Sequence, residues 1–356
     1  MAKIIVGMSG GVDSAVTAYL LKAAGHDVIG VTLKTWVASD GKESRCCEID
    51  DAQIVADMLQ IPYYAQNCLN EFRECVTEPF SREYLNGRTP NPCIECNRYI
   101  KWDRLLYMAK VMNADYVATG HYAGVVRLAN GRYTVKKALH AGKDQTYMLY
   151  KLTQEQLKHT LMPLGNLTKD EVRSIAEKAR LPVSKKPDSQ EICFVPDGRY
   201  TDFLKENYPD EIPPEGYFVD ESGKVLGKHK GISEYTVGQR KGLGISASHP
   251  LYVTRIDAGD NRIVLAGEES LYKREIVCKD VNFMGIGEIG PDEELHCEVK
   301  VRYHHAGSRA IVKGLSDGNV DIVFDEKIKA PTPGQSAVFY DESGCVLGGG
   351  IIDATY

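Results

Sequence analysis

The chain has no long apolar run, and this absence excludes a class of protein. A helix that crosses a membrane needs about 18 or more consecutive apolar residues, and no such run occurs in the 356 residues. The start of the chain also lacks the pattern of a secretory signal, since residues 1–6 are typical of a buried strand. Ten cysteines at irregular spacings, without such a signal, favour reduced thiols. We therefore predict a cytoplasmic protein without a membrane anchor.

The chain also lacks an excess of basic residues. Its formal net charge of −6 excludes indiscriminate binding of nucleic acid through overall charge. A local basic face remains compatible with this value, because binding depends on how charge is distributed. Short basic clusters occur at residues 136–137, 185–186, 228–230, 240–241 and 302–305. Each of these is also typical of an ordinary solvated surface.

The glycine loop near the start of the chain lacks the lysine of a kinase or GTPase phosphate loop. It lies between an apolar strand at residues 3–8 and a helical pattern at residues 15–24, and it consists of Ser9, Gly10, Gly11, Val12, Asp13 and Ser14. In this arrangement backbone N–H groups and the helix dipole converge on an anion. Gly10 and Gly11 are expected to adopt positive φ so that a phosphate can approach the backbone. No Gly-Lys-Ser or Gly-Lys-Thr follows, so no lysine reaches a γ-phosphate.

The loop resembles the SGGxDS loop of the ATP pyrophosphatases. Those enzymes cleave ATP between the α- and β-phosphates and adenylate a carbonyl oxygen. The resemblance implies an α/β fold with a doubly wound, mostly parallel sheet of the adenine nucleotide alpha-hydrolase type, and a nucleotide at the carboxyl ends of the strands. An ordinary turn rich in Ser and Gly is the alternative.

Alternating strands and helices support this fold class. Strands are predicted at residues 3–8, 27–33, 62–66 and 115–119, and helices at 15–24, 50–60, 69–85 and 98–112. This alternation is typical of a parallel sheet covered on both faces. A hairpin is predicted at residues 125–139 around an Asn-Gly turn, and a capping box opens a helix at residues 168–180.

Past residue 203 the pattern changes to short β-branched runs. Turn residues separate them at intervals of about 10 residues, which is typical of small β domains or a barrel. We predict a catalytic domain at residues 1–205, a small middle domain at 206–274 and a β-barrel-like domain at 275–356. The two β-rich units are expected to be separate from the nucleotide fold.

Some of the cysteines have sequence contexts that suit chemistry. Cys93 and Cys96 lie in a proline-bounded loop, and Cys96 is expected just before a helix, whose N-terminus stabilises a thiolate. Cys193 lies in a polar segment. A Cys-x-x-Cys pair is compatible with a redox pair or zinc, but adjacent Cys46 and Cys47 have a poor spacing to complete a tetrahedral site. Small buried hydrophobes are the interpretation for Cys68, Cys75, Cys278, Cys297 and Cys345.

Several motifs occur in the order seen in the bacterial tRNA-specific 2-thiouridylases. They lie at residues 9–14, 87–92, 96–97, 119–122, 142–147, 188–194 and 236–244. The resemblance covers essentially the whole chain. It implies insertion of sulfur at C2 of the wobble uridine of tRNA, with ATP, Mg²⁺ and a persulfide sulfur donor such as a cysteine desulfurase or relay protein.

Residue roles follow from the same resemblance. Adenylation would turn the C2 oxygen into part of AMP, a good leaving group. Cys193 would accept a persulfide sulfur, Cys96 would be its nucleophilic partner, and Asp13 would act in catalysis. A Cys96–Cys193 disulfide, which a reductant must reopen, would close one course of the reaction. The implied nucleotide contacts are Gly7, Met8, Ser9, Gly10, Gly11, Val12, Asp13, Ser14, Leu33 and Gly120. The implied tRNA contacts are Asn91, Pro92 and Cys93 at the target base, and His121, Lys143, Asp144, Gln145, Arg302, Tyr303 and Gln335 elsewhere.

Cys93 departs from the pattern, because the best-known members of that family carry an aspartate at this position. A third cysteine opens an alternative in which Cys93, Cys96 and Cys193 hold a [4Fe–4S] cluster that carries the sulfur. Outside the family, an ATP pyrophosphatase that amidates a small metabolite is the nearest rival, although its chemistry needs no cysteine. A non-catalytic RNA-binding protein is a second rival, but RNA binding alone does not need the glycine loop.

Overall fold

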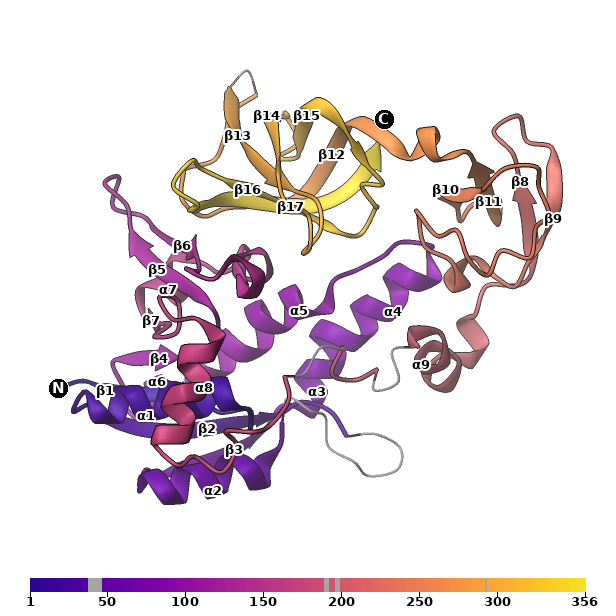
Figure 1. Ribbon diagram of the computed structural model, residues 1–356. Coiled ribbons are helices and arrows are strands. Elements are labelled where there is room, and N and C mark those ends of the chain that lie inside the picture. Colours follow the sequence, from indigo (N-terminus) through magenta and orange to yellow (C-terminus); the bar gives the residue numbers. More distant parts are fainter. Residues whose placement is uncertain (38–46, 189–191, 196–198, 292) are drawn as a thin grey trace.

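The computed structural model describes residues 1–37, 47–188, 192–195, 199–291 and 293–356 (Figure 1). A central parallel sheet has the strand order β3-β2-β1-β4-β7. Its strands are β1 (Lys3–Gly7), β2 (Asp27–Lys34), β3 (Tyr63–Asn67), β4 (Tyr116–Ala118) and β7 (Thr160–Leu161). This order, with crossover helices between the strands, confirms the predicted doubly wound α/β fold.

Alternation along β1 assigns the two faces of the sheet. Ile4 and Val6 belong to one buried cluster together with α1 (Val12–Ala23), α2 (Ile49–Leu59) and α8 (Lys169–Lys178). Ile5 belongs to a second cluster on the other face. The helical segments of that face are α3 (Leu69–Phe72), a π-helical turn (Arg73–Thr77), α4 (Glu78–Leu85), α5 (Pro92–Glu95), a second π-helical segment (Cys96–Trp102) and α6 (Asp103–Val111). Helices therefore cover both faces, as predicted.

The helix that carries Cys93 and Cys96 begins earlier than predicted. The sequence suggests a loop through residue 97, but helical backbone runs from Pro92 through α5 and the π-helical segment into α6. Asn91 caps this start, since its side-chain oxygen accepts from the Cys93 N–H at 3.2 Å. Pro92 at the first helical position needs no N–H partner. The prediction that Cys96 lies just before a helix is therefore wrong, and Cys93 lies closer to the helix N-terminus.

Two local predictions are confirmed. The hairpin consists of β5 (Ala123–Arg127) and β6 (Tyr133–Lys137). The capping box of α8 is present, with Thr168 and Glu171 each bonded to the other residue's backbone. The remaining helical elements before residue 212 are short: Ala141–Lys143, Thr146–Leu149, α7 (Gln154–Lys158), α9 (Tyr200–Asn207) and Pro209–Glu211.

The β-rich part forms two further units, as the fold class predicted (Figure 1). The middle unit is a sheet of order β10-β11-β8-β9, built from β8 (Gly216–Val219), β9 (Val225–His229), β10 (Tyr252–Asp257) and β11 (Arg262–Ala266). The last unit is a closed barrel of β12 (Tyr272–Phe283), β13 (Glu294–Lys300), β14 (Ser308–Gly314), β15 (Val320–Lys329), β16 (Ser336–Tyr340) and β17 (Val346–Thr355). The expected boundaries at 205/206 and 274/275 fall inside α9 and β12, and the three-domain division stays a prediction.

The barrel is not separate from the nucleotide fold. Val338, Tyr340 and Val346 belong to the same buried cluster as Ile5 of the central sheet. The hairpin adds polar links, including a hydrogen bond of 2.5 Å from Thr134 Oγ1 to the Val346 carbonyl. The middle unit has its own small core around Phe218 and Ile263. Within the ranges described above, no helix is both long and apolar enough to cross a membrane.

Candidate active site at the carboxyl ends of the parallel strands

One pocket joins the glycine loop to the cysteine-bearing helix. Its lining includes seven of the predicted nucleotide contacts, namely Gly7, Met8, Ser9, Asp13, Ser14, Leu33 and Gly120. The same pocket is lined by Cys96, His121 and Gln145, which the sequence assigned to sulfur transfer or tRNA, and by Lys101 of the same helix as Cys96. Gly10, Gly11 and Val12 belong to the loop but do not line this pocket. The structure thus brings two predicted sets of residues to one place.

Two glycines allow neighbouring backbone segments of this site to approach one another closely. Gly10 has φ +77°, as expected, and a Cβ there would lie 2.6 Å from the carbonyl oxygen of Glu48. A Cβ on Gly120 would lie 2.8 Å from backbone atoms of Asp13 and Ser14. The expectation for Gly11 is wrong, because its φ is −95° and it is the extended N-cap of α1. Gly120 therefore supports the loop by close packing against it.

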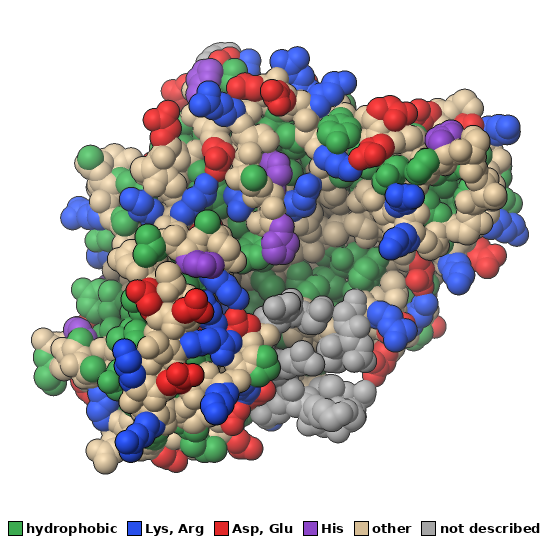
Figure 2. All heavy atoms as spheres, in the orientation of Figure 1, with side chains coloured by type: hydrophobic (Ala, Val, Ile, Leu, Met, Phe, Trp, Pro, Cys, Tyr) green, Lys and Arg blue, Asp and Glu red, His purple; other side chains and the backbone are tan. Residues whose placement is uncertain are grey.

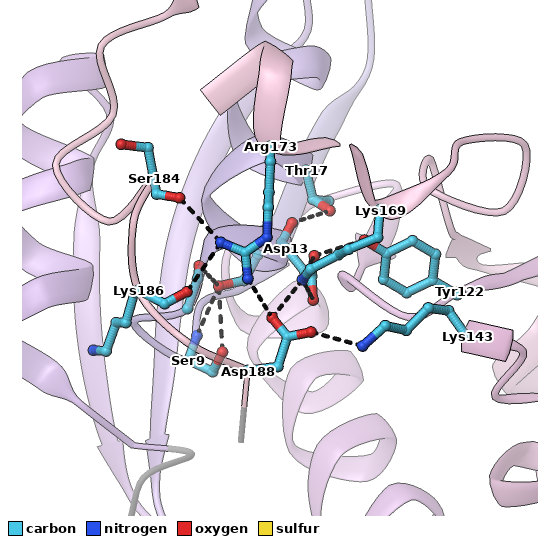
Figure 3. A network of polar contacts seen from close by, with 12 residues as sticks. Ser9, Asp13, Thr17, Tyr122, Lys143, Lys169, Arg173, Ser184, Lys186 and Asp188 are labelled. Atoms are coloured by element: carbon cyan, nitrogen blue, oxygen red, sulfur yellow. Dashed lines mark hydrogen bonds and ion pairs between the residues drawn. The ribbon is translucent and has the colours of Figure 1, made fainter. Parts of the chain in front are cut away.

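The Asp13 carboxylate is held by two partners (Figure 3). Lys169 donates from its Nζ to both carboxylate oxygens, at 2.8 and 2.9 Å. The Tyr122 hydroxyl donates to Oδ1 at 2.8 Å. Lys169 is buried, and sequence reasoning did not single it out. The capping box could have drawn attention to this lysine, because it placed Lys169 at the first position of α8.

Asp188 lies next to this pair. Its carboxylate contacts Lys169 and Lys143, each at 2.7 Å, and Arg173 at 3.2 Å. Partial burial raises the pKa of Asp188, but hydrogen bonds from Lys143 and Lys169 outweigh this and hold its pKa below the usual range. Further along, Lys186 donates to the carbonyl of Gly10 at 3.1 Å. The segment before Cys193 is thereby tied to the nucleotide loop.

His121 is a buried, neutral side chain of the pocket. Its Nδ1 lies 2.9 Å from Thr119 Oγ1, and its ring lies 5.4 Å from the Trp102 ring. Burial, with a smaller effect from the charge of Lys101, lowers the pKa of His121 well below its ordinary value. It therefore offers a neutral imidazole near pH 7. Gln145 lies beside it and accepts from the Tyr122 N–H at 2.9 Å.

The three cysteines of interest differ in exposure. Cys96 is buried, Cys193 is a half-buried free thiol, and Cys93 is exposed. Within the described ranges, no three Cys, His, Asp or Glu side chains lie close enough together to hold a metal ion. The proposed [4Fe–4S] ligand set is therefore not assembled in this geometry. Cys46 and three residues of the Cys193 motif, Ser189, Gln190 and Glu191, lie outside the described residues.

The remaining cysteines vary in burial. Cys68, Cys278 and Cys345 are buried as expected, whereas Cys75 and Cys297 are only partly buried. Burial raises the pKa of Cys68, and that of Cys297, to about 12. Neither thiol is poised to ionise near neutral pH.

Several predicted tRNA contacts hold parts of the protein together. Gln335 of the barrel donates from Nε2 to the Thr89 carbonyl at 2.7 Å. Arg302 donates to the Lys329 carbonyl at 3.0 Å. Asp144 is buried and accepts from the Ala138 N–H at 3.0 Å. The motif at residues 87–92 thus contacts the barrel through the Thr89 carbonyl, just before the helix that carries Cys96.

Other predicted contacts lie around the cysteine helix. The Asn91 side chain caps this helix, and Pro92 is buried in its first turn. Tyr303 is half-buried, with its ring 6.3 Å from the Tyr147 ring. Burial raises the pKa of Tyr303, and the charge of Asp144 adds to this effect. Tyr303, between β13 and β14 of the barrel, therefore packs against the buried cluster that contains Tyr147.

The surface of this region is hollowed. Figure 2 shows a depression between the nucleotide domain, the barrel and the middle unit, with apolar side chains on its floor and lysines and arginines beside it. Lys143 is among the basic residues of the site, although it pairs with Asp188. The net charge of the chain is negative, so these cations form a local feature.

Comparisons with known proteins agree with this geometry. Family models match three successive stretches: a tRNA methyl transferase HUP domain at residues 2–197, a tRNA methyl transferase PRC-barrel domain at 201–267 and an aminomethyltransferase beta-barrel domain at 273–352. The tRNA-specific 2-thiouridylase MnmA of Acetivibrio thermocellus is 50% identical over 358 residues, covering 98% of this chain and 99% of that protein. The protein of the same name from Lachnoclostridium phytofermentans is 48% identical over 359 residues, covering 99% of each.

Similarity to solved structures is weaker. The U34-tRNA thiolase NcsA from Methanococcus maripaludis, solved with its [4Fe-4S] cluster, shares 22% identity and a TM-score of 0.36 over 59% of this chain and 67% of that one. A similarity of this size supports no statement about the site. The full-length identity to the curated relatives, together with the three family models, shows that the chain belongs to the tRNA-specific 2-thiouridylase family.

Proposed function

We propose that this protein catalyses the ATP-dependent 2-thiolation of the wobble uridine of tRNA. The observation that carries the proposal is the shared pocket, in which the loop suited to phosphate and the Cys96 thiol lie together. Activation of an oxygen and its replacement by sulfur need both groups within reach of one base. The cytoplasm, where tRNA is modified, is the compartment that fits this substrate.

Activation of the uridine comes first in this scheme. The C2 oxygen attacks the α-phosphate of ATP, pyrophosphate leaves, and the oxygen becomes part of an AMP leaving group. The backbone N–H groups of the loop and the N-terminus of α1 are proposed to bind the phosphates. The Asp13 carboxylate is held in one orientation because Lys169 and Tyr122 donate hydrogen bonds to it. Leu33 and Gly120 line the same pocket and are proposed to contact the adenosine.

Sulfur transfer uses the two thiols of the scheme. The donor protein supplies a sulfane sulfur that makes Cys193 a persulfide. In one course the terminal sulfur attacks C2 and displaces AMP, and Cys96 then attacks the Cys193 sulfur, releasing the 2-thiouridine. In the other, Cys96 first attacks the persulfide and releases hydrosulfide, which displaces AMP. Both leave a Cys96–Cys193 disulfide that an external dithiol must reduce.

A [4Fe–4S] cluster is the alternative sulfur carrier. The exposed Cys93 and the buried Cys96 are not part of a three-ligand group in the described residues, so this arrangement does not fit a cluster. We therefore route no step through it. Mg²⁺ is a better fit, because it binds mainly to the phosphates of ATP and needs few protein ligands. Asp13 is a carboxylate of the pocket that suits this role.

The target base enters between the cysteine helix and the barrel. Asn91, Pro92 and Cys93 lie at the start of that helix, and Tyr303 of the barrel packs against the buried cluster that includes Cys96. The base must leave the anticodon stack to reach the pocket, as in other enzymes that modify bases. Arg302 and Gln145 are proposed to contact the RNA directly. Asp144 and Gln335 are proposed to act by holding the loops that do so.

The test uses purified protein with ATP, a persulfide donor and unmodified tRNA. Formation of AMP, pyrophosphate and 2-thiouridine in equal amounts, only with tRNA present, is the expected result. Pyrophosphate exchange stimulated by an amino acid or a small carboxylate instead of tRNA would favour the amidating enzyme. Binding of tRNA with no hydrolysis of ATP would favour the non-catalytic RNA-binding protein. Mass spectrometry of tRNA from a strain lacking the gene should show loss of 2-thiouridine.

A further inference from the structure

A carboxylate is surrounded by three cations at the edge of the glycine loop. Lys169 Nζ and Arg173 Nη2 lie 2.7 and 3.2 Å from Asp188 Oδ1. Lys143 Nζ lies 2.7 Å from the other oxygen, Oδ2. The cations come from two separate elements, since Lys169 and Arg173 are on α8 and Lys143 ends the short helical turn at residues 141–143. Figure 3 shows all three side chains pointing toward Asp188.

This geometry suits an anion larger than a carboxylate. Two ammonium groups and a guanidinium present many N–H donors to two oxygens, which is the donor set that proteins offer to phosphates. Lys143 and Arg173 are about one third exposed, at 36% and 34%, so they can follow a different anion. Lys169 also bridges to Asp13 at 2.8 Å. The cluster is therefore continuous with the loop to which we assign nucleotide binding.

We propose that Lys143, Lys169 and Arg173 bind the pyrophosphate part of ATP, and that Asp188 is its internal competitor. This inference rests on the proposed nucleotide binding. Asp188 holds the cations in position, and phosphate binding must displace it from them. A pyrophosphate carries more negative charge than one carboxylate and can contact all three cations at once. Asp188 therefore weakens phosphate binding while it keeps the cations assembled.

Displacement of Asp188 also affects Cys193. Asp188 stands five positions before this cysteine in the sequence. Arg173 holds the same segment through the carbonyls of Ser184 and Lys186, each at 3.3 Å. A phosphate that takes over Arg173 and displaces Asp188 loosens both ties. The environment of the Cys193 thiol thereby becomes dependent on the nucleotide, and by linkage the position of the segment alters phosphate affinity.

The test measures pyrophosphate binding by titration calorimetry, without tRNA, for the full-length protein and its variants. Asp188→Asn removes the competing charge and leaves Lys169 paired with Asp13. We expect pyrophosphate and ATP to bind at least about fivefold more tightly to this variant. Asp170→Asn is the matched control, because it removes an exposed carboxylate that is next to Lys169 in the sequence but lies outside the cluster. Its affinity is expected to stay within about twofold of wild type.

A second readout follows Cys193 directly. Alkylation of this thiol by iodoacetamide is followed by mass spectrometry of its peptide, with and without pyrophosphate. Pyrophosphate is expected to change the rate in wild type. Asp188→Asn without pyrophosphate is expected to react at the rate of the wild-type complex. An unchanged rate in both proteins would overturn the coupling to Cys193.

The outcomes separate this inference from the proposed function. If the wild type binds neither ATP nor pyrophosphate, the proposed function fails. If the wild type binds them and Asp188→Asn binds them equally or more weakly, the competitor role fails while the function stands. If Asp188→Asn does not fold, Lys143→Gln tests the same cluster, and its pyrophosphate affinity must fall at least about fivefold. Unchanged affinity in Lys143→Gln would overturn its role as a phosphate ligand.

Discussion

Lys151 and Glu95 form an ion pair of 2.7 Å next to the cysteine of the active-site pocket. Lys151 is buried, and it also contacts Asp280 of the barrel at 2.5 Å. Burial lowers the pKa of Lys151, but the two carboxylates outweigh this and raise it above its ordinary value. One lysine thus links the helix that carries Cys96 to the barrel that is proposed to bind the RNA.

Replacing this lysine should weaken the joint. Lys151→Met removes the buried charge and leaves two carboxylates that water can reach. We expect a loss of stability of about 1–3 kcal/mol and a matching fall in melting temperature. Lys158→Met, on the exposed side of α7, is the control and should change stability by less than about 0.5 kcal/mol. Equal melting temperatures for the two variants would contradict the structural role of Lys151.

Gly120→Ala should damage the nucleotide site. The new methyl group would lie 2.8 Å from the backbone of Asp13 and Ser14, so the glycine loop must shift. We expect overpacking to cost about 1–3 kcal/mol and ATP binding to fall more than tenfold, an approximate value for a displaced loop. Gly287→Ala provides the control, because its Cβ would meet no atom within 4 Å. Differential scanning fluorimetry and ATP titration of both variants provide the comparison.

Loss of the loop's polar groups should separate the two halves of the reaction. Asp13→Ala and Ser14→Ala are expected to abolish adenylation, because they remove side chains from the pocket to which we assign the phosphates of ATP. Affinity for tRNA should stay nearly unchanged, since the proposed RNA contacts lie on other segments. Pyrophosphate release and tRNA binding are measured on the same preparations. Normal pyrophosphate release combined with lost tRNA binding would contradict the assignment of this loop.

The two sulfur mechanisms predict different results for Cys93. In the two-thiol relay, Cys96→Ala and Cys193→Ala abolish thiolation by iron-free protein, whereas Cys93→Ala keeps most of it. The structure favours this result, because Cys93 is exposed and Cys96 lines the pocket. Anaerobic reconstitution is the counter-test. About four irons per chain, required for activity and lost in Cys93→Ala, would establish the cluster instead.

Stability should depend on acid through Asp188. Its pKa is lower in the folded protein, so ionised Asp188 stabilises the fold above the ordinary aspartate pKa of about 4. This contribution is lost as the pH falls through the folded pKa. The melting temperatures of wild type and Asp188→Asn should therefore differ at pH 7 and converge as the pH falls below about 4. A constant difference over this range would contradict the role of the carboxylate charge.

The sequence predicted the central fold because its signals are local. Glycine turns, capping residues and apolar periodicity each act within a few residues, and they fixed the parallel sheet and the helix at α8. The start of the helix at Pro92 was missed because prolines and cysteines suggested a loop. Asn91 had already provided the cap that starts it.

Contacts between residues far apart in the chain could not be predicted from such local patterns. The sequence pointed to Lys143 as a tRNA contact, but its ion pair with Asp188 joins residues far apart in the chain. Local sequence patterns gave no sign that Lys169 and Arg173 meet Asp188. The barrel looked separable because its strands have a regular pattern of their own, whereas Val346 packs in the core of the nucleotide domain. A truncation at residue 275 would therefore expose part of that core.

The continuous helical segment from Pro92 to Val111 fixes the spacing between residues that line the candidate active site. Cys96, Lys101 and Leu105 lie on this segment, and all three line the pocket. Cys96 and Lys101 stand five residues apart in the π-helical segment, whose backbone hydrogen bonds join residues i and i+5, and Leu105 follows in α6. Their mutual spacing is therefore fixed by the number of residues between them. Lengthening this segment by a single residue would rotate the thiol away from the nucleotide while leaving both groups intact. The order and rate of activation and sulfur transfer can depend on loops and ligands. The spacing between the pocket residues Cys96, Lys101 and Leu105 is set by the helix itself.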